Sequence, residues 1–301
     1  MMAIERVAIV GLGLIGSSVA RAVKERLPQV TVVGHDAKAE VRDIARELGF
    51  CDIIADAPAA AVADADLVIF AVPVGGMADA ARAVAPGLRD GVIISDVGSS
   101  KAGVAAALGA ALPGHIVIPA HPVAGTENSG PAAGFASLFE GRWCIVTPGA
   151  GAPEDAVAAL AGFWQALGAR VETMDAAHHD MVLAVTSHLP HLIAYTIVGT
   201  ASELEEVTES EVIKYSAGGF RDFTRIAASD PVMWRDVFLA NKEAVLATLQ
   251  RFNEDLTVLQ QAIRRGDAGK LEDWFTRTRA IRRSIIEQGQ DDAAPDFGRK
   301  H

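Results

Sequence analysis

The amino-acid sequence predicts an α/β protein: a doubly wound parallel sheet followed by an all-α C-terminal domain. Short β-rich runs alternate with helical patterns in the first half, a glycine-rich turn follows the first run, and strand patterns stop after residue 174. Repeated strand–helix–strand units require parallel strands with helices on both faces. We therefore expect a sheet domain over residues 1–174 and a helical domain over residues 175–301.

The predicted strands are nearly continuous in apolar residues, as expected for strands that are buried on both faces. They cover 6–10, 30–35, 66–72, 92–96, 116–120 and 144–147. The helices between them are predicted at 15–26, 38–48, 76–84, 101–110 and 154–167.

The second half reads as helices throughout. A largely apolar helix is expected over 175–201, with a kink at Pro190 because proline removes one backbone hydrogen bond. Pro231 suits a first helical position, with Ser229 or Asp230 as its cap, and the helix is expected to run to about residue 264. Gly266 breaks it, another helix reaches about residue 287, and the polar tail 288–301 is expected to fray.

The composition restricts the class of partner. The 301 residues carry a net charge of −11, which argues against a nucleic acid or an anionic membrane surface as partner. An anionic substrate would need locally clustered cations. Cys51 and Cys144 lack metal or disulfide spacing and are expected to be reduced, buried thiols. With no signal-like start, no apolar run approaching a membrane span and no metal-ligand spacing, a cytoplasmic enzyme without a metal is expected.

The glycine-rich turn predicts a dinucleotide site of the Rossmann type. In the run 11–16, Gly11 permits a tight turn, Gly13 lets the backbone approach a pyrophosphate, and Gly16 lets helix and strand pack closely. Leu14 and Ile15 open the following helix, whose N-terminus offers free N–H groups to the pyrophosphate.

Asp36 closes the second strand 20 residues after Gly16, where a carboxylate binds the ribose 2′-hydroxyl and repels a 2′-phosphate. NAD is therefore the expected cofactor, and His35 leaves some room for dual use. The competing interpretation is a structural turn with a solvated Asp36. Val72 and Pro73 end a later strand and belong to the same expected cleft, because open α/β sheets bind ligands at their carboxyl edges.

Two side chains at strand ends suit proton chemistry. His121 can accept a proton from a substrate hydroxyl, or it can simply cap backbone at the end of its strand. Ser99 can hydrogen-bond the same hydroxyl or cap the helix that starts near Lys101. Lys101 itself is interpreted as a solvated helix residue.

The apolar helix of the second half carries a polar stripe. Asp180, Ser187 and His191 fall within about 40° of one another at 100° per residue. Such a stripe either faces a solvent-filled cleft or lies in an interface between helices, where its polar groups are hydrogen-bonded. His178, His179 and His188 fall on other faces and are interpreted as structural or exposed.

A second group of candidates follows Gly218 and Gly219. Arg225 can bind a carboxylate with its guanidinium fork, whereas Arg221 and Arg235 are expected to be solvated or paired with acids. Trp234 can form a wall of the pocket or belong to the core.

Together, these motifs resemble the prephenate and arogenate (cyclohexadienyl) dehydrogenases of tyrosine biosynthesis over most of the chain. The resemblance is carried by the glycine run and by residues 96–101, 121–127, 187–191, 222–225 and 233–236. It implies that His121 accepts the ring-hydroxyl proton with help from Ser99. It also implies that Arg225, Ser187, His191 and Trp234 bind the substrate, that Glu127 gates the entrance, and that Asp180 supports the site.

The resemblance further implies oxidative decarboxylation of prephenate, or of arogenate, with NAD, in a homodimer formed through the helical domain. Tyrosine feedback, if present, would act at the active site, since no regulatory domain is recognised in the sequence. Two alternatives are kept. One is a β-hydroxyacid dehydrogenase or imine reductase, and the other is a non-catalytic NAD-sensing regulator.

Overall fold

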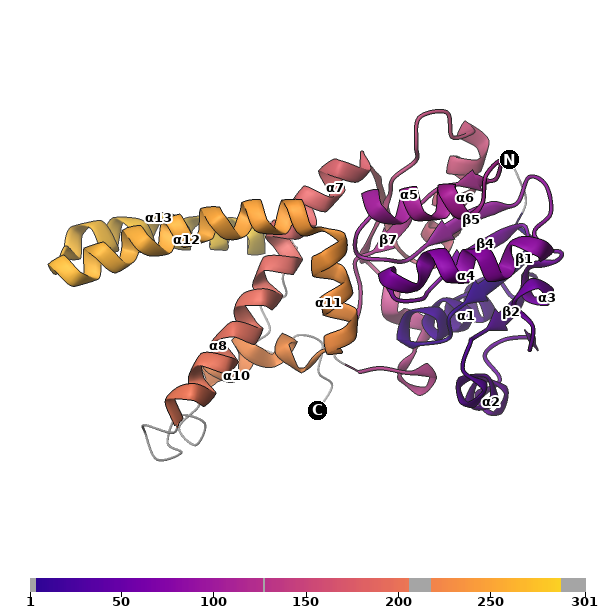
Figure 1. Cartoon of the computed structure of the whole chain (residues 1–301), viewed down its shortest axis with the longest axis horizontal. Coiled ribbons are helices and arrows are strands. Elements are labelled where there is room, and N and C mark those ends of the chain that lie inside the picture. Colours follow the sequence, from indigo (N-terminus) through magenta and orange to yellow (C-terminus); the bar gives the residue numbers. More distant parts are fainter. Residues whose placement is uncertain (1–3, 127, 206–217, 288–301) are drawn as a thin grey trace. The chain divides into compact units, whose positions relative to one another are not determined.

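The computed structural model describes residues 4–126, 128–205 and 218–287. Its larger sheet is parallel, with the strand order β3-β2-β1-β4-β5-β6; Figure 1 labels β2, β1, β4 and β5 of this sheet. Its strands are β1 (Arg6–Val10), β2 (Thr31–His35), β3 (Ile53–Ile54), β4 (Leu67–Phe70), β5 (Ile93–Asp96) and β6 (Ile116–Val117). The order reverses between β1 and β4, and such a switch point is where open α/β sheets bind ligands. The predicted fold class is confirmed.

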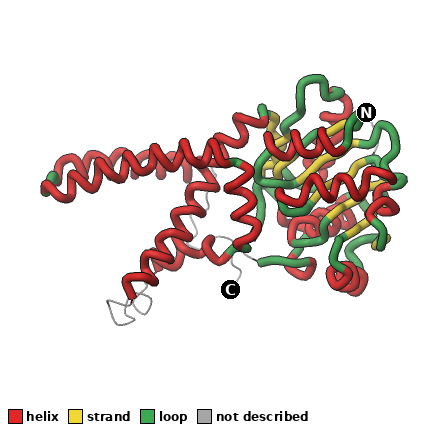
Figure 2. Tube along the Cα trace, in the orientation of Figure 1, coloured by secondary structure: helices red, strands yellow, loops and turns green. Residues whose placement is uncertain are grey.

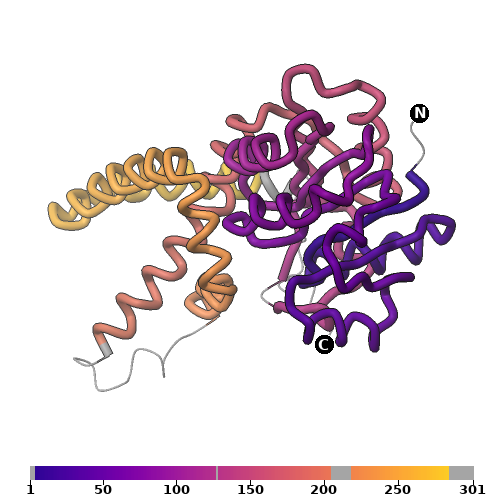
Figure 3. Tube along the Cα trace, turned by 45° about the vertical axis from the view of Figure 1, so that its right-hand side comes forward, coloured from indigo at the N-terminus to yellow at the C-terminus, as the bar shows by residue number. Residues whose placement is uncertain are grey.

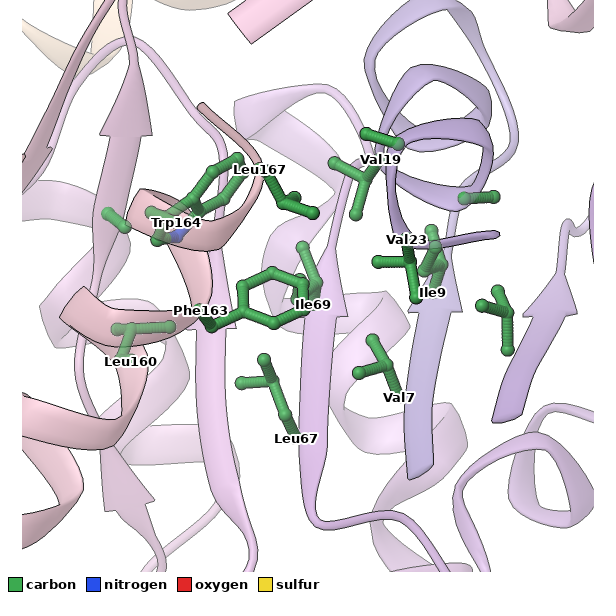
Figure 4. Close-up of a cluster of buried hydrophobic side chains, with 14 of the residues drawn as sticks. Val7, Ile9, Val19, Val23, Leu67, Ile69, Leu160, Phe163, Trp164 and Leu167 are labelled. Atoms are coloured by element: carbon green, nitrogen blue, oxygen red, sulfur yellow. The ribbon is translucent and has the colours of Figure 1, made fainter. Parts of the chain in front are cut away.

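Alternate residues of the strands form two separate hydrophobic cores. Val7 and Ile9 belong to the core on one face, with side chains of α1 (Leu14–Arg26) and α6 (Glu154–Ala166) (Figure 4). Ala8 and Val10 belong to the core on the other face, with residues from these helices: α3 (Pro58–Val62), α4 (Met77–Val84) and α5 (Ala102–Ala111). Helix α2 (Ala39–Leu48) follows β2. Both cysteines are buried free thiols, as predicted.

A second, smaller sheet was not predicted. It contains β7 (Ala120–Pro122), β8 (Trp143–Val146) and β9 (Arg170–Thr173), and β7 runs antiparallel to β8. The prediction of one strand over 116–120 in a single parallel sheet was therefore wrong. The hydrogen bonding to β5 ends at Ile118, because the next residue, Pro119, has no N–H to continue it. The chain then pairs with β8 instead. Two further strands were not predicted from the sequence: β3, which has two residues, and β9, which is largely exposed.

The helical segment after β9 begins with α7 (Ala176–Leu183), a π-helical turn (Ala184–His188) and α8 (Leu189–Glu205). Helix α10 (Gly218–Thr224), a 3₁₀ turn (Arg225–Ala228) and α11 (Pro231–Ala240) come next. The Asp230 carboxylate accepts a hydrogen bond from the Met233 N–H, so of the two caps predicted for α11 the structure has Asp230. The long helix predicted from Pro231 is interrupted at Asn241.

One expectation about hydropathy was wrong. Residues Ala176–Leu204 form a helical stretch that is long and apolar enough, by length and composition, to cross a membrane. It was not predicted from the sequence, because its apolar runs are short and separated by polar residues. Two of them, His179 and Asp180, are buried and hydrogen-bonded to the sheet domain, which is the behaviour of a helix packed in a folded site.

By its contacts the chain divides into two compact units, residues 1–245 and 246–301. All described strands belong to the first unit, whereas the described part of the second is helical (Figure 2). The second unit contains most of α12 (Lys242–Arg265) and all of α13 (Ala268–Glu287), which run side by side in Figures 1 and 3. Gly266, with φ of 68°, separates the two helices as predicted. The predicted frayed tail lies outside the described residues.

Candidate active site

The glycine turn between β1 and α1 has the backbone that a dinucleotide requires. Gly11 has a φ of +100°, and a Cβ there would lie 2.5 Å from the Ala71 carbonyl oxygen. A Cβ on Gly16 would lie 1.9 Å from the Gly11 carbonyl oxygen, so close packing explains that glycine. A Cβ on Gly13 would meet no atom within 4 Å, and α1 has no side-chain cap. Open space before an uncapped helix N-terminus, which Leu14 and Ile15 begin, fits a pyrophosphate.

Asp36 lies at the end of β2, beside this turn. One carboxylate oxygen accepts a hydrogen bond from the Leu12 N–H at 2.9 Å, and the other accepts one from the Lys38 N–H at 2.9 Å. Val72 and Pro73 follow β4, and a Cβ on Gly11 would approach Val72 Cγ1 to 3.0 Å. The residues predicted to hold NAD therefore gather at one edge of the sheet.

His121 lies on β7, where it is 7% exposed and hydrogen-bonded to another histidine. Its Nδ1 is 2.8 Å from Nε2 of His179, and Nδ1 of His179 is 2.9 Å from an oxygen of Asp180. The His121 side chain thus bonds to a side chain rather than capping backbone. His179 was predicted to be structural or exposed, and its burial excludes the second alternative, because the fold brings α7 against β7.

Asp180 also joins α7 to the start of α5. Its two carboxylate oxygens accept hydrogen bonds from the backbone N–H groups of Lys101 and Ala102, at 2.7 and 2.9 Å. The N-cap of α5 is Lys101, so the alternative in which Ser99 caps this helix was wrong. Ser99 is half-buried, and its hydroxyl makes no hydrogen bond to His121 within the described residues.

Lys101 was predicted to be solvated but is fully buried, with its ammonium 2.5 Å from Asp96. The ammonium also donates to the Ala120 carbonyl at 2.7 Å, and Asp96 accepts from the Gly98 N–H at 2.7 Å and the Ala120 N–H at 3.3 Å. The pair therefore hydrogen-bonds both the N–H and the carbonyl of Ala120, the residue before His121. A buried charge is tolerated only with such a partner.

The π-helical turn alters the polar stripe that was predicted on one helix face. A π turn contains more residues than an α turn, so the 100° spacing fails across 184–188. Asp180 is directed to α5, while Ser187 lies half-buried in the turn and its carbonyl accepts a hydrogen bond from Nδ1 of His191 at 2.9 Å. This carbonyl lies in the region where Pro190 was expected to open the helix.

His191 forms a second cluster with Trp234 of α11. Their rings are stacked, with centroids 3.6 Å apart and planes at 24°. Trp234 is 7% exposed, and its Nε1 is buried without a hydrogen-bond partner in the described part of the chain. Arg225, half-buried at the start of the 3₁₀ turn, lies close enough for its charge to lower the pKa of His191, although burial is the larger cause.

His188 and Asn241 lie between the two clusters. His188 was predicted to be structural or exposed; it is fully buried, and it packs edge-on against Trp234 with centroids 6.0 Å apart. The Asn241 amide nitrogen lies 2.7 Å from the Asp180 carbonyl oxygen and 3.1 Å from Nδ1 of His188. Asn241 therefore fixes both α7 and the π-helical turn.

Burial keeps these imidazoles neutral. It lowers the pKa of His121 well below its usual 6.5, and the positive charge of Lys101, together with any proton on His179 or His188, acts in the same direction. Burial also lowers the pKa of His188 to about 4 and that of His179 to a value below normal, despite the hydrogen bond to Asp180. Burial acts in the opposite sense on Asp180, but hydrogen bonds from His179 and the α5 backbone leave its pKa lowered, so it is ionised.

The structure brings together most of the residues that were predicted from the sequence and adds residues that connect them. Of the predicted candidates, Glu127 lies outside the described residues. Arg235 is paired with Asp236 and Arg221 is exposed, as predicted. His179, His188 and Asn241 were missed. The only available signal for His179 was its place beside Asp180 on an apolar helix.

A glycine-turn nucleotide fold whose sheet edge meets buried, polar helical residues defines a dinucleotide-dependent dehydrogenase. Two family models match the chain. The model of the prephenate dehydrogenase nucleotide-binding domain matches residues 19–173, and that of the prephenate dehydrogenase dimerization domain matches residues 175–277. The chain belongs to the prephenate dehydrogenase family.

Individual relatives agree with this assignment. The chain is 47% identical to the cyclohexadienyl dehydrogenase of Zymomonas mobilis, over 95% of this chain and 97% of that protein. It is 34% identical to the prephenate dehydrogenase of Bacillus subtilis, over 97% of this chain and 79% of that protein. The crystal structure of Aquifex aeolicus prephenate dehydrogenase with hydroxyphenyl propionate and NAD+ superposes with a TM-score of 0.88 and 32% identity, covering 94% of this chain and 99% of that one.

Proposed function

We propose that this protein is an NAD-dependent prephenate or arogenate dehydrogenase that oxidatively decarboxylates prephenate to 4-hydroxyphenylpyruvate, or arogenate to tyrosine. The observation that carries the proposal is the buried series His121–His179–Asp180 at the edge of a nucleotide-binding sheet. Relatives named for these activities, one of them 47% identical, support the substrate class. The reaction removes a proton and a hydride from the ring carbinol, and loss of CO2 then makes the ring aromatic.

The hydrogen bonds support one route for the proton. An ionised Asp180 only accepts hydrogen bonds, so Nδ1 of His179 carries a proton. The neutral His179 ring then accepts at Nε2, which requires Nδ1 of His121 to carry a proton. Nε2 of neutral His121 is left as an acceptor, which is the atom we assign to the substrate's ring hydroxyl. Ser99, three residues after the end of β5, is proposed to share that hydroxyl.

The base lies on the smaller sheet and is tied to the end of β5 in the sheet that carries the cofactor site. NAD would be held by Asp36 and by the turn that Gly11, Gly13 and Gly16 form, and it would supply the hydride acceptor. The buried Lys101–Asp96 pair fixes the backbone of Ala120, and with it the position of His121 on β7. Such fixed placement lowers the entropic part of the barrier, because the reacting atoms need no further ordering.

The second cluster is proposed to bind the carboxylate end of the substrate. Arg225 offers a guanidinium fork, and His191 lies close to it with Trp234 stacked behind. Because Nδ1 of His191 donates to the Ser187 carbonyl, its Nε2 is an acceptor while the ring is neutral. We assign Ser187 to the same end of the substrate. In a chain of net charge −11, these local groups must offset a repulsive overall field.

Further assignments rest on the family resemblance and on the surface of the helices. We propose that Glu127 gates the entrance and that the domain boundary lies at 174/175, as the sequence predicts. The homodimer is supported by the match to the dimerization domain and by apolar side chains exposed on the helices. Those on the unit 246–301 are Leu246, Leu256, Ile263, Phe275 and Ile281, each at least 46% exposed. A cytoplasmic location and competition by tyrosine at the active site complete the proposal.

Turnover assays test the function directly. Purified protein would be given prephenate, arogenate and simple β-hydroxyacids, each with NAD and NADP, while NADH formation and CO2 release are measured. We expect both signals with prephenate or arogenate and neither with β-hydroxyacids. Tight NAD binding with no turnover of either cyclohexadienyl substrate would favour a non-catalytic NAD sensor and refute the proposal. Light scattering at several protein concentrations tests the dimer.

A further inference from the structure

An arginine of α2 hydrogen-bonds to the backbone of the loop after β2. Nη1 of Arg42 donates to the carbonyl oxygens of Asp36 and Ala37, at 2.8 and 3.3 Å. Its side chain is only 15% exposed. A guanidinium therefore lies within hydrogen-bond distance of the residue whose carboxylate is assigned to the cofactor ribose.

This arginine is already paired with a carboxylate from another loop. Nε of Arg42 is 3.1 Å from an oxygen of Asp56, which follows β3. The same oxygen is 2.5 Å from Nη2 of Arg46, so one carboxylate partners two guanidinium groups. Hydrogen bonds from Arg46, and then from Arg42, lower the pKa of Asp56 and keep it ionised.

The neighbouring helix end also suits an anion. Lys38 is the N-cap of α2, and the helix starts there without a side-chain cap. Its first turn thus adds backbone N–H groups to the cation of Arg42 and the ammonium of Lys38. In the described residues the hydrogen bonds of Arg42 use Nε and Nη1, which leaves the Nη2 edge of the fork for a further acceptor.

We propose that Arg42, assisted by Lys38, is a latent site for the 2′-phosphate of NADP, and that two carboxylates keep it inactive. Asp36 repels the phosphate directly, and Asp56 occupies Arg42. The selectivity for NAD is then set by the balance of these charges on a surface that already contains the groups an NADP site needs. The proposal rests on NAD binding at this sheet edge and not on the identity of the oxidised substrate.

The test measures binding, so it does not depend on turnover. The dissociation constants of NADH and NADPH would be determined by fluorescence titration for the wild type, Asp36→Ser, Asp36→Ser/Arg42→Met and Asp36→Ser/Arg46→Met. We expect Asp36→Ser to tighten NADPH binding by about tenfold to a hundredfold, the range for gaining one charge-assisted contact. Adding Arg42→Met should remove that gain, whereas adding Arg46→Met, the matched control, should leave most of it.

The outcomes separate a phosphate ligand from a residue that only supports the loop. Loss of loop support would weaken the binding of NADH and of NADPH by the same factor. Loss of a residue that binds the 2′-phosphate would weaken the binding of NADPH alone. Equal NADPH affinity in Asp36→Ser and Asp36→Ser/Arg42→Met would refute the proposal. If Asp36→Ser fails to fold, Asp56→Asn provides the second test. This change should tighten NADPH binding about threefold by releasing Arg42 and should leave NADH binding unchanged. An unchanged NADPH affinity would refute the proposal.

A failure of the proposed function gives a different pattern. In that case the protein binds NADH and shows the predicted NADPH response but oxidises neither prephenate nor arogenate. Loss of NADH binding in the wild type would instead refute the cofactor site on which this inference depends.

Discussion

The cofactor turn and the histidine cluster are built in contrasting ways. The cofactor turn is local: Gly11, Gly13 and Gly16 lie within six residues, and each has its own backbone reason for being glycine. The histidine cluster is assembled from distant segments, because 58 residues separate His121 from His179 and 61 separate Asp180 from Asn241. The local site can be recognised in a single motif. The assembled site depends on how helices pack against a sheet, so changes in it should affect catalysis through several elements at once.

The largest effect should come from the base of the assembled site. We expect His121→Asn to lower kcat by about 10²- to 10⁴-fold with little change in KM, the range for loss of a general base. Steady-state kinetics with the accepted cyclohexadienyl substrate checks this. A kcat close to that of the wild type would remove His121 from the reaction.

His179 tests whether the buried series positions the base. His179→Ala removes the acceptor for Nδ1 of His121 and should lower kcat by about 10- to 100-fold, with the KM for NAD unchanged. His179→Gln, which can still bridge the two neighbours, should retain more activity than the alanine variant. The exposed neighbour His178→Ala is the matched control and should behave as the wild type. If His179→Ala lowers only the melting temperature, its role is structural.

Arg225 should show the opposite division between kcat and KM. Arg225→Gln removes a charged hydrogen bond to a substrate carboxylate, which corresponds to a KM raised by about 10- to 100-fold. Because binding is weakened equally in the ground and transition states, kcat should change little. An unchanged KM together with lower thermal stability would make Arg225 a structural residue.

The two glycines of the cofactor turn should separate binding from folding. Gly13→Ala introduces a Cβ into space that is open in the protein alone, so the melting temperature should hold while the KM for NAD rises by about tenfold. Gly16→Ala forces a Cβ to within 1.9 Å of the Gly11 carbonyl oxygen and should lower the melting temperature as well. Melting temperatures measured without cofactor distinguish the two variants, and equal melting temperatures would contradict these separate roles of Gly13 and Gly16.

The pH dependence should be the smallest effect near neutrality. His121 accepts a proton only when neutral, so kcat/KM should fall as the pH decreases through the pKa of His121. Burial and nearby positive charges place that pKa well below 6.5, so kcat/KM should be flat from pH 6.5 upward through neutrality. A pH profile of kcat/KM checks this, and an acidic limb centred at or above pH 6.5 would contradict the buried, neutral histidine.

The sequence by itself determined the α/β architecture, the glycine turn, Asp36 at the end of β2, the cap of α11 and the candidate pair His121 and Arg225. Each depends on local backbone requirements or on a short motif, and both can be recognised from a few consecutive residues. Only the tertiary structure showed that Lys101 is buried against Asp96, that β7 belongs to a second sheet, and that His179 contacts His121. These depend on contacts between segments far apart in the chain, and hydrophobic periodicity does not specify which polar group meets which across such a distance.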